Sequence, residues 1–335
     1  MTREFAAAAQ KAAPAGTVIR MKLQASPTTQ TKGPAMPDWL EITLFSAATD
    51  AERNAQIAQL LQALNAVAAR HKLAPGTRGE QRNGTSLSFR SGTRITHSIE
   101  IGFARRAAPA QREVADSPRL AIILDDLGSD RAAAESIFAL PYPVTISVLP
   151  NHEHSKEIAD EALQRGFQVM LHLPMQSIAN EAPEKEELRP GMSAAQVQSL
   201  LGEMIESVPN AVGVNNHQGS QATSDPALMK ELMPALRGLN LFYVDSRTTA
   251  ATVAFDIAQQ DGVPAAFRNV PFLDDVQDAA AIRKQLQLAL RGAKEKKAAI
   301  AIGHPHPATL GALREFLPTV RENGVRLVFA SDLVH

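Results

Sequence analysis

Residues 120–128, Leu120-Ala-Ile-Ile-Leu-Asp-Asp-Leu-Gly128, decide the fold of most of this chain. Their uninterrupted apolar run predicts a strand buried on both faces, as in a parallel sheet, because a strand with one solvated face alternates apolar and polar positions. Two carboxylates and a glycine follow that strand directly. Short strands recur from here to the end of the chain, at residues 120–124, 144–149, 168–173, 211–214, 241–244, 266–270, 298–302 and 326–329.

The segments between these strands predict amphipathic helices with recognisable ends. Ser193 followed by Gln196 is typical of a capping box, and Asp225 before Pro226 is typical of an N-cap with proline at the first helical position. Glycines stand where helices are expected to stop, at Gly166, Gly238 and Gly324. Seven or eight such units predict an α/β fold, a distorted (β/α) barrel of seven to eight strands, with a doubly wound open sheet as the alternative.

The chain before Pro118 differs in composition. Residues 1–37 are rich in Ala, Pro, Thr, Gln and Lys and are expected to be poorly ordered, with one strand near 17–23. Residues 38–106 predict a small α+β module, with strands at 40–45, 86–89 and 95–103 and a helix that begins at Asp50. Residues 107–117 predict a linker, which leaves residues 118–335 for the barrel. The module shows no cluster of acids and histidines, so a scaffold, linker or partner-binding role is favoured.

Composition excludes several classes of function. Lys plus Arg number 34 and Asp plus Glu 35, for a net charge of −1, whereas nucleic-acid binding driven by overall basicity needs a surplus of cations. The absence of cysteine excludes disulfides, thiolate nucleophiles and cysteine metal sites.

No membrane span is expected, because the apolar runs are far shorter than the ~20 residues of a membrane helix. The first residues lack the apolar core of a secretory signal, so they are either the natural terminus or the start left by removal of an export signal or anchor.

Polar side chains follow five of the predicted strands. They stand at carboxyl ends, the edge at which parallel barrels build active sites. We therefore expect them to meet at one rim. They are Asp125, Asp126, His172, His217, Asp245 and His304.

Several of these residues have structural alternatives. Asp125 and Asp126 could cap a helix that begins near Ser129, and His172, between two leucines, could be a core histidine. Of His304 and His306, only one needs to face the site. The remaining histidines are expected outside the site, at His71, His97, His152, His154 and His335.

One carboxylate and two imidazoles form a usual ligand set for zinc or a similar divalent ion, and they leave a position open for water. Such an ion lowers the pKa of water and polarises a carbonyl. A second carboxylate can then accept the proton of the water, and a histidine can protonate the leaving group. No nucleophile elbow, Walker loop or dinucleotide-binding pattern is found, so a metal-dependent hydrolase is favoured.

The segments around these residues resemble the divergent polysaccharide deacetylases, a bacterial branch of the NodB-homology carbohydrate esterases. The matching segments are 122–128, 145–150, 170–175, 213–220, 242–246 and 303–306. The resemblance covers about residues 118–335 and implies a distorted (β/α) barrel with a metal-dependent amidohydrolase site. It implies nothing for residues 1–117.

The resemblance also implies a role for each matched residue. Asp125 corresponds to the general base, Asp126 to the metal-binding acid and His172 to the first metal histidine. His304 lies where the catalytic acid is expected.

This chain departs from the mainstream pattern at two places. The second metal histidine would fall at Gln176, so the third ligand is assigned to His217. The arginine-proline-glycine motif is also missing, with Asn215, Asn216 and Gly219 in its place. Asp245 or Arg247 is expected to orient Asp125.

These roles imply N-deacetylation of an acetylated cell-envelope carbohydrate or peptidoglycan-like substrate, with a divalent metal, zinc first, and a periplasmic or secreted location. Two alternatives stay open: a metal hydrolase for another amide or ester, and a non-catalytic metal- or glycan-binding envelope protein, with residues 38–106 as a site for a protein partner. Aromatic residues are only 4% of the chain. Because sugar-binding sites often use aromatic rings, a small or unusual acetylated substrate is favoured over a long glycan.

Overall fold

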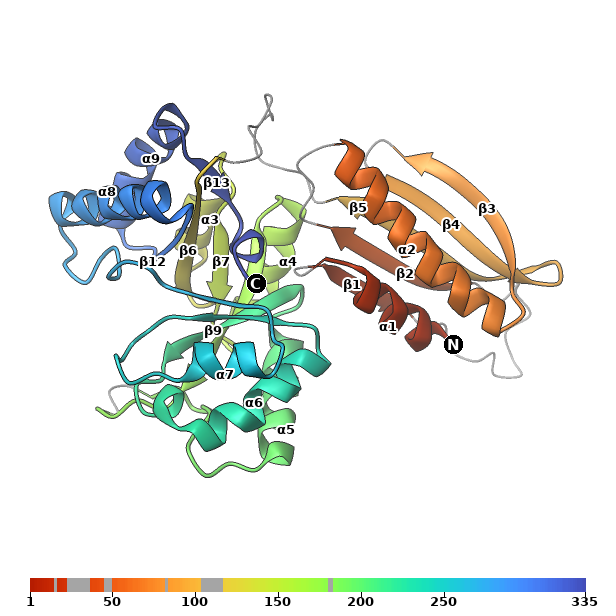
Figure 1. Cartoon of the computed structure of the whole chain (residues 1–335), viewed down its shortest axis with the longest axis horizontal. Coiled ribbons are helices and arrows are strands. Elements are labelled where there is room, and N and C mark those ends of the chain that lie inside the picture. Colours follow the sequence, from red (N-terminus) through yellow and green to blue (C-terminus); the bar gives the residue numbers. More distant parts are fainter. Residues whose placement is uncertain (15–16, 23–36, 45–49, 82–83, 104–116, 180–182) are drawn as a thin grey trace. The chain divides into compact units, whose positions relative to one another are not determined.

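The chain folds around two separate hydrophobic cores. The computed structural model describes residues 1–14, 17–22, 37–44, 50–81, 84–103, 117–179 and 183–335. The chain divides into two compact units, Met1–Ala104 and Arg105–His335 (Figure 1).

A parallel sheet organises the second unit. Its strands follow the order β11-β10-β9-β8-β7-β6-β12, and β13 pairs with the first half of β6. Each strand overlaps one predicted from the sequence. The strands are β6 (Arg119–Leu127), β7 (Thr145–Val148), β8 (Gln168–Met175), β9 (Ala211–Gln218), β10 (Phe242–Asp245), β11 (Ala265–Phe267), β12 (Ala298–Gly303) and β13 (Arg326–Val328).

An irregular segment after β11 bridges the two ends of this sheet. The backbone N–H of Asn269 donates to the carbonyl of Ile300 in β12 at 3.0 Å, and the N–H of Leu273 donates to Ile302 at 2.9 Å. The N–H of Ile300 donates in return to Oδ1 of Asn269 at 2.6 Å. The sheet is therefore a nearly closed barrel, closed here by a loop and not by a full strand. The predicted distorted (β/α) barrel is confirmed, and the open doubly wound sheet is excluded.

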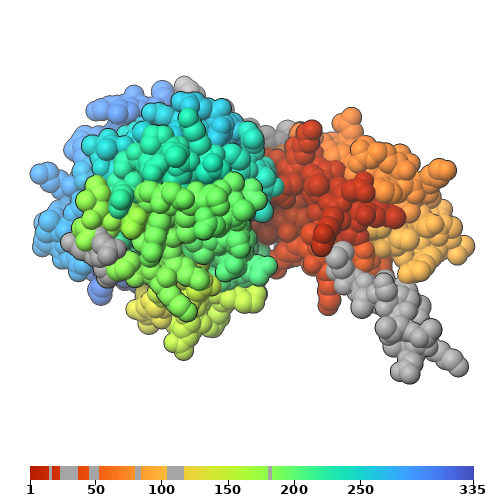
Figure 2. Space-filling model, turned by 90° about the horizontal axis from the view of Figure 1, so that it is seen from below, coloured from red at the N-terminus to blue at the C-terminus, as the bar shows by residue number. Residues whose placement is uncertain are grey.

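Helices cover the outside of the barrel. In the space-filling view, the face of this unit that is turned to the reader is mainly green to cyan, the part of the sequence that includes α5, α6 and α7 (Figure 2). The capping patterns at Ser193 and Asp225 are confirmed: Gln196 and Ser193 bond reciprocally, and the Asp225 carboxylate accepts from two N–H groups in the first turn of α6. The helices are α3 (Arg131–Phe138), α4 (Ser155–Gln164), α5 (Ala194–Ser207), α6 (Pro226–Gly238), α7 (Ala254–Gln260), α8 (Ala279–Lys296) and α9 (Pro307–Glu322).

The first unit is a five-stranded sheet with two helices on one face (Figure 1). The strand order is β1-β2-β5-β4-β3, in which β2 and β5 are parallel and the other pairs antiparallel. The elements are α1 (Thr2–Ala12), β1 (Val18–Lys22), β2 (Asp38–Leu44), α2 (Asp50–Arg70), β3 (Ala74–Gln81), β4 (Gly84–Ser91) and β5 (Arg94–Phe103). The predicted α+β character of this part of the chain is therefore found.

The expectation that residues 1–37 are poorly ordered is wrong for the beginning of the chain. Residues 2–12 form α1, and Phe5 and Ala9, one helical turn apart, are fully buried in the core of the unit. Alanine has the highest intrinsic helix propensity, so burial of one narrow stripe is enough to hold the helix. The strand near 17–23 is found as β1, so the module begins before residue 38. Residues 23–36, and the predicted linker as far as residue 116, lie outside the described residues.

We expect Gly213→Ala to destabilise the second unit. Gly213 in β9 pairs with the buried Phe242 in β10, and a Cβ at Gly213 would lie 2.4 Å from that ring. Overpacking of this kind costs about 1–3 kcal/mol. Urea unfolding followed by far-UV circular dichroism measures the loss. Trp39, the sole tryptophan, reports on the first unit by fluorescence and separates the two transitions.

Gly202→Ala is the matched control. A Cβ at this position in α5 meets nothing within 4 Å, so the exchange is expected to be neutral or to stabilise by up to about 1 kcal/mol. Equal stability of Gly213→Ala and the wild type would contradict the packing argument.

Candidate metal centre

Two adjacent carboxylates reach the rim of the barrel from β6. Successive strand residues normally point to opposite faces, but the register of β6 against β7 shifts between Leu124 and Leu127. Within this irregularity Asp126 has φ 58°, a left-handed conformation that costs free energy outside glycine. The bulge is what allows Asp125 and Asp126 to serve one site.

Asp126 meets two histidines from neighbouring strands. Its Oδ1 lies 3.1 Å from Nε2 of His172 in β8 and 3.1 Å from Nδ1 of His217 in β9. The two imidazole nitrogens are 3.2 Å apart. Ligand atoms at 2.0–2.1 Å from a tetrahedral zinc ion are about 3.3 Å from one another, so one ion fits this triangle.

A second observation supports a cation at this point. Oδ1 of Asp126 is buried and accepts no well-aligned hydrogen bond, which is costly unless something else satisfies it. Burial opposes its ionisation, but hydrogen bonding and electrostatic interaction with His172 and His217 outweigh burial and hold the pKa of Asp126 far below its usual range. The carboxylate is therefore ionised, as a metal ligand must be.

Asp125 occupies a different environment. It is 1% exposed, and Nδ2 of Asn215 donates to its two oxygens at 2.9 and 3.0 Å. Burial raises the pKa of Asp125 against the opposing charges of His172 and His304. A carboxylate with a raised pKa beside a candidate metal position suits a general base.

Asn215 contacts both Asp125 and His172. While its Nδ2 donates to Asp125, its Oδ1 lies 3.0 Å from Nδ1 of His172 and also accepts from the hydroxyl of Ser147. Since Oδ1 can only accept, Nδ1 of His172 carries a proton, and Nε2 is the nitrogen that faces the triangle and would bind a metal there. Sequence reasoning noticed Asn215 only as a departure from the arginine motif. Asn215 stands two residues before His217 in the same strand, and residues at this spacing point to the same face of a sheet. This spacing could have predicted that Asn215 belongs to the site.

His304 follows β12 and is held by Asp274, which the sequence analysis did not identify. Oδ1 of Asp274 accepts from Nδ1 of His304 at 2.8 Å. Its Oδ2 accepts from the His304 N–H and from the hydroxyl of Thr309, both at 2.7 Å. Nε2 of His304 then lies 3.8 Å from Oδ2 of Asp126. Asp274 was missed because it belongs to the irregular segment that closes the barrel, where no strand end marks it.

The surroundings of His304 favour its protonated form. Burial opposes the charge, but the hydrogen bond to Asp274 and the charges of Asp125, Asp126 and Asp274 outweigh burial and raise the pKa of His304 to about 9. A histidine that is charged at neutral pH can donate a proton to a leaving group.

Asp245, which was expected to orient Asp125, is fully buried and contacts other groups. Its oxygens accept from the Arg247 N–H and from the hydroxyl of Thr252, both at 2.8 Å. These bonds hold the loop that follows β10. In the described residues Asn215, not Asp245 or Arg247, donates the hydrogen bonds that orient Asp125.

The structure shows the contacts of other polar residues near the rim. Asp130, not Asp125 or Asp126, caps α3. His152 and His154 face Glu184 and Glu157 instead of the triangle. The backbone of Gln176 forms hydrogen bonds with the backbones of Leu188, Gln221 and Ala222.

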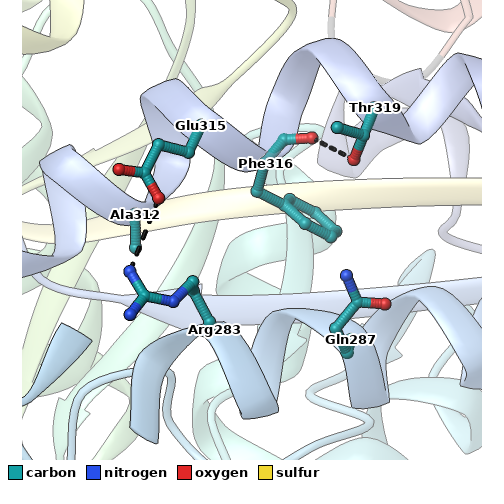
Figure 3. A pocket seen from close by; sticks show the side chains of 6 residues that line it. All are labelled: Arg283, Gln287, Ala312, Glu315, Phe316 and Thr319. Atoms are coloured by element: carbon teal, nitrogen blue, oxygen red, sulfur yellow. Dashed lines mark hydrogen bonds and ion pairs between the residues drawn. The ribbon is translucent and has the colours of Figure 1, made fainter. Parts of the chain in front are cut away.

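A separate pocket lies between α8 and α9 on the outside of the barrel (Figure 3). It is lined by Arg283, Gln287, Ala312, Glu315, Phe316 and Thr319.

Comparisons with known proteins agree with this geometry. The sequence matches the model of the divergent polysaccharide deacetylase family over residues 122–334. The chain is similar to the Escherichia coli (strain K12) protein YibQ, described as uncharacterized, at 39% identity over 217 residues, 65% of this chain and 67% of that one. It is also similar to an uncharacterized Haemophilus influenzae protein, at 38% identity over 215 residues, 64% of this chain and 76% of the other.

A solved structure shares the fold. The crystal structure of the uncharacterized protein ATU2773 from Agrobacterium tumefaciens C58 has a TM-score of 0.63 and 21% identity, and the match covers 67% of this chain and 92% of that one. The family model spans more than half of the chain and includes every residue of the candidate metal centre. The chain belongs to the divergent polysaccharide deacetylase family.

Proposed function

We propose that this chain is a metal-dependent deacetylase that hydrolyses the N-acetyl group of a cell-envelope carbohydrate. The observation that carries the proposal is the triangle of Asp126, His172 and His217, flanked by a buried carboxylate with a raised pKa and by a histidine that is charged at neutral pH. Ligands, base and acid are the parts that hydrolysis of an amide by activated water requires.

A divalent ion, zinc first, is the cofactor that this donor set fits. Bound there, it supplies Lewis acidity: it polarises the acetyl carbonyl and lowers the pKa of water. Asp126, His172 and His217 are the residues that would hold it.

The residues of the chain account for the proton transfers. Asp125 accepts a proton as water attacks the acetyl carbon, and Asn215 keeps its oxygens in place. His304 donates its Nε2 proton to the nitrogen of the departing amine while Asp274 stabilises its charge through Nδ1. One water and one acetamide group become acetate and an amine, and the two residues exchange protons with solvent between turnovers.

Substrate class is inferred from the surroundings of the rim. Of the two tyrosines in the chain, Tyr243 is fully buried and donates its hydroxyl to Asn216. Aromatic residues make up only 4% of the chain. Because sites for long glycans commonly offer several rings for stacking, the proposed substrate is a short acetylated unit of a peptidoglycan-like polymer.

A cell-envelope substrate implies a periplasmic or secreted location, which we propose together with the activity. Within the described ranges, no helix combines the length and the apolar character needed to cross a membrane. The first unit, which offers no group of metal-ligating side chains among its described residues, is proposed to bind a protein partner.

Asp126→Ala and His217→Ala are each expected to lose the metal held by the triangle of Asp126, His172 and His217. Even the outer partners of a metal ligand contribute about 10–100-fold to affinity, so removal of a ligand itself should cost at least that much. Equilibrium dialysis against zinc measures binding, and acetate release from N-acetylated chitooligosaccharides and peptidoglycan fragments measures activity. His154→Ala is the control, because this histidine faces Glu157 outside the triangle.

If both variants bind as many zinc ions as the wild type, the ligand assignment is overturned. Metal binding without acetate release from any substrate would support a non-catalytic envelope protein. Hydrolysis confined to other amides or esters would support a different metal hydrolase.

The alkaline limb of the pH–rate profile is expected to depend on Asp274. Because activity needs His304 protonated, it should be full below the pKa of that histidine and fall as pH rises through it. Asp274→Asn removes the charge that stabilises the imidazolium, so the limb should move to lower pH, by about 1–3 units. Thr309→Val, which removes only one hydrogen bond to Asp274, should leave it near the wild-type position. An unmoved limb in Asp274→Asn would refute this role.

The acid limb is expected to depend on Asn215. Asn215→Asp has nearly the same shape but places a carboxylate against Asp125 in place of an N–H donor. Like charges raise the pKa further, so the acid limb of kcat/KM should move to higher pH by about 1 unit or more. Ser246→Ala, which removes a 3.2 Å contact of the same amide, is the control. A uniform loss of activity at every pH would show that Asn215 is merely structural.

A further inference from the structure

A second cluster of metal-ligating side chains stands beside the first. Asp274, His304 and His306 each offer one ligand atom, and these atoms lie within 4.8 Å of one another. Across the described residues, this cluster and the triangle of Asp126, His172 and His217 are the two groups of at least three such side chains. They share no residue.

The second cluster is partly preorganised. Asp274 is 5% exposed and is fixed through Oδ2 by the His304 N–H and the Thr309 hydroxyl. Its Oδ1 is 2.8 Å from Nδ1 of His304, so these two atoms have to separate by about 0.5 Å to reach the spacing of about 3.3 Å between ligand atoms of a tetrahedral zinc ion. The side chain therefore needs little rearrangement to face an ion.

His306 supplies the third donor. Its ring centroid is 5.8 Å from that of His304, with the planes at 40°, because the two residues are separated only by Pro305. Its Nε2 lies 3.1 Å from Nε2 of Gln277, and since the amide nitrogen can only donate, the imidazole nitrogen accepts. A nitrogen that accepts a hydrogen bond has the lone pair that a metal requires.

We propose that Asp274, His304 and His306 form a second, inhibitory site for zinc or a similar divalent ion, which fills when the metal is in excess. The donor set, one carboxylate and two imidazoles, is of the kind that zinc prefers. This inference rests on the proposed function for its effect on activity, but not for the binding itself.

Binding at this site removes the acid from the reaction. The ion takes the lone pair of Nδ1 of His304 in place of the proton that Nδ1 donates to Asp274, and that proton is released to solvent. His304 is then a neutral ligand and not an imidazolium, so it no longer donates a proton to the amine. Activity should rise with the first equivalent of metal and fall with the second.

Zinc titration of the full chain tests the proposal. Equilibrium dialysis should find two zinc ions per wild-type chain, one in Asp126→Ala, which loses the first site, and one in His306→Gln, which loses the second. In acetate release, His306→Gln should keep the activation and need at least tenfold more zinc for inhibition. His154→Gln, another histidine beside a carboxylate, should behave as the wild type.

One zinc ion per wild-type chain throughout the titration, or two ions in His306→Gln, would overturn the proposal. If two ions bind, and one is lost in His306→Gln, while no acetylated substrate is hydrolysed, the second site stands and the deacetylase proposal fails. If acetate is released and excess zinc inhibits wild type and His306→Gln alike, the deacetylase proposal stands and the inhibitory site fails.

Discussion

The break in the register of β6 is the constraint on which the candidate site depends. A regular strand would direct Asp125 and Asp126 to opposite faces of the sheet. The shift against β7 and the left-handed φ of Asp126 place one carboxylate in a buried polar pocket and the other against two imidazoles. Two identical side chains then acquire opposite pKa shifts, upward for Asp125 and downward for Asp126, which suit the different roles proposed for them.

A buried amide offsets the free-energy cost of this arrangement. Asn215 satisfies Asp125 with its N–H groups and His172 with its oxygen, so one side chain on β9 positions both the proposed base and a proposed metal ligand. An arginine in this place would neutralise Asp125 and lower its pKa, whereas a neutral donor fixes the carboxylate and lets burial keep the pKa raised. The loss of the mainstream arginine motif is therefore compatible with a general base, and the expected orienting residues after β10 are not needed for it.

Sequence predicted the barrel and the residues at its strand ends well, because apolar runs and the polarity that follows them are local signals. His172, His217, His304 and the aspartate pair could all be assigned to one rim before any coordinates. The sequence did not predict the role of Asp274, because this residue lies in an irregular segment and not at the end of a strand. It also did not predict that Asn215, and not Asp245, is the hydrogen-bond partner of Asp125. Helix α1 was missed for a related reason: an alanine-rich segment folds only when a neighbouring sheet buries Phe5 and Ala9.

The irregular segment that distorts the barrel also positions His304, the proposed proton donor. A complete strand after β11 would close the sheet with a regular ladder and direct alternate side chains inward and outward. The segment that stands there instead donates to β12 through Asn269 and Leu273, and the very next residue, Asp274, bonds both the backbone and the ring of His304 at the end of β12. Barrel closure thus fixes the histidine relative to Asp126 across the rim. Asp274 and His304 also lie close to His306, so the contacts that orient the proposed proton donor are the ones that the proposed second metal site would use.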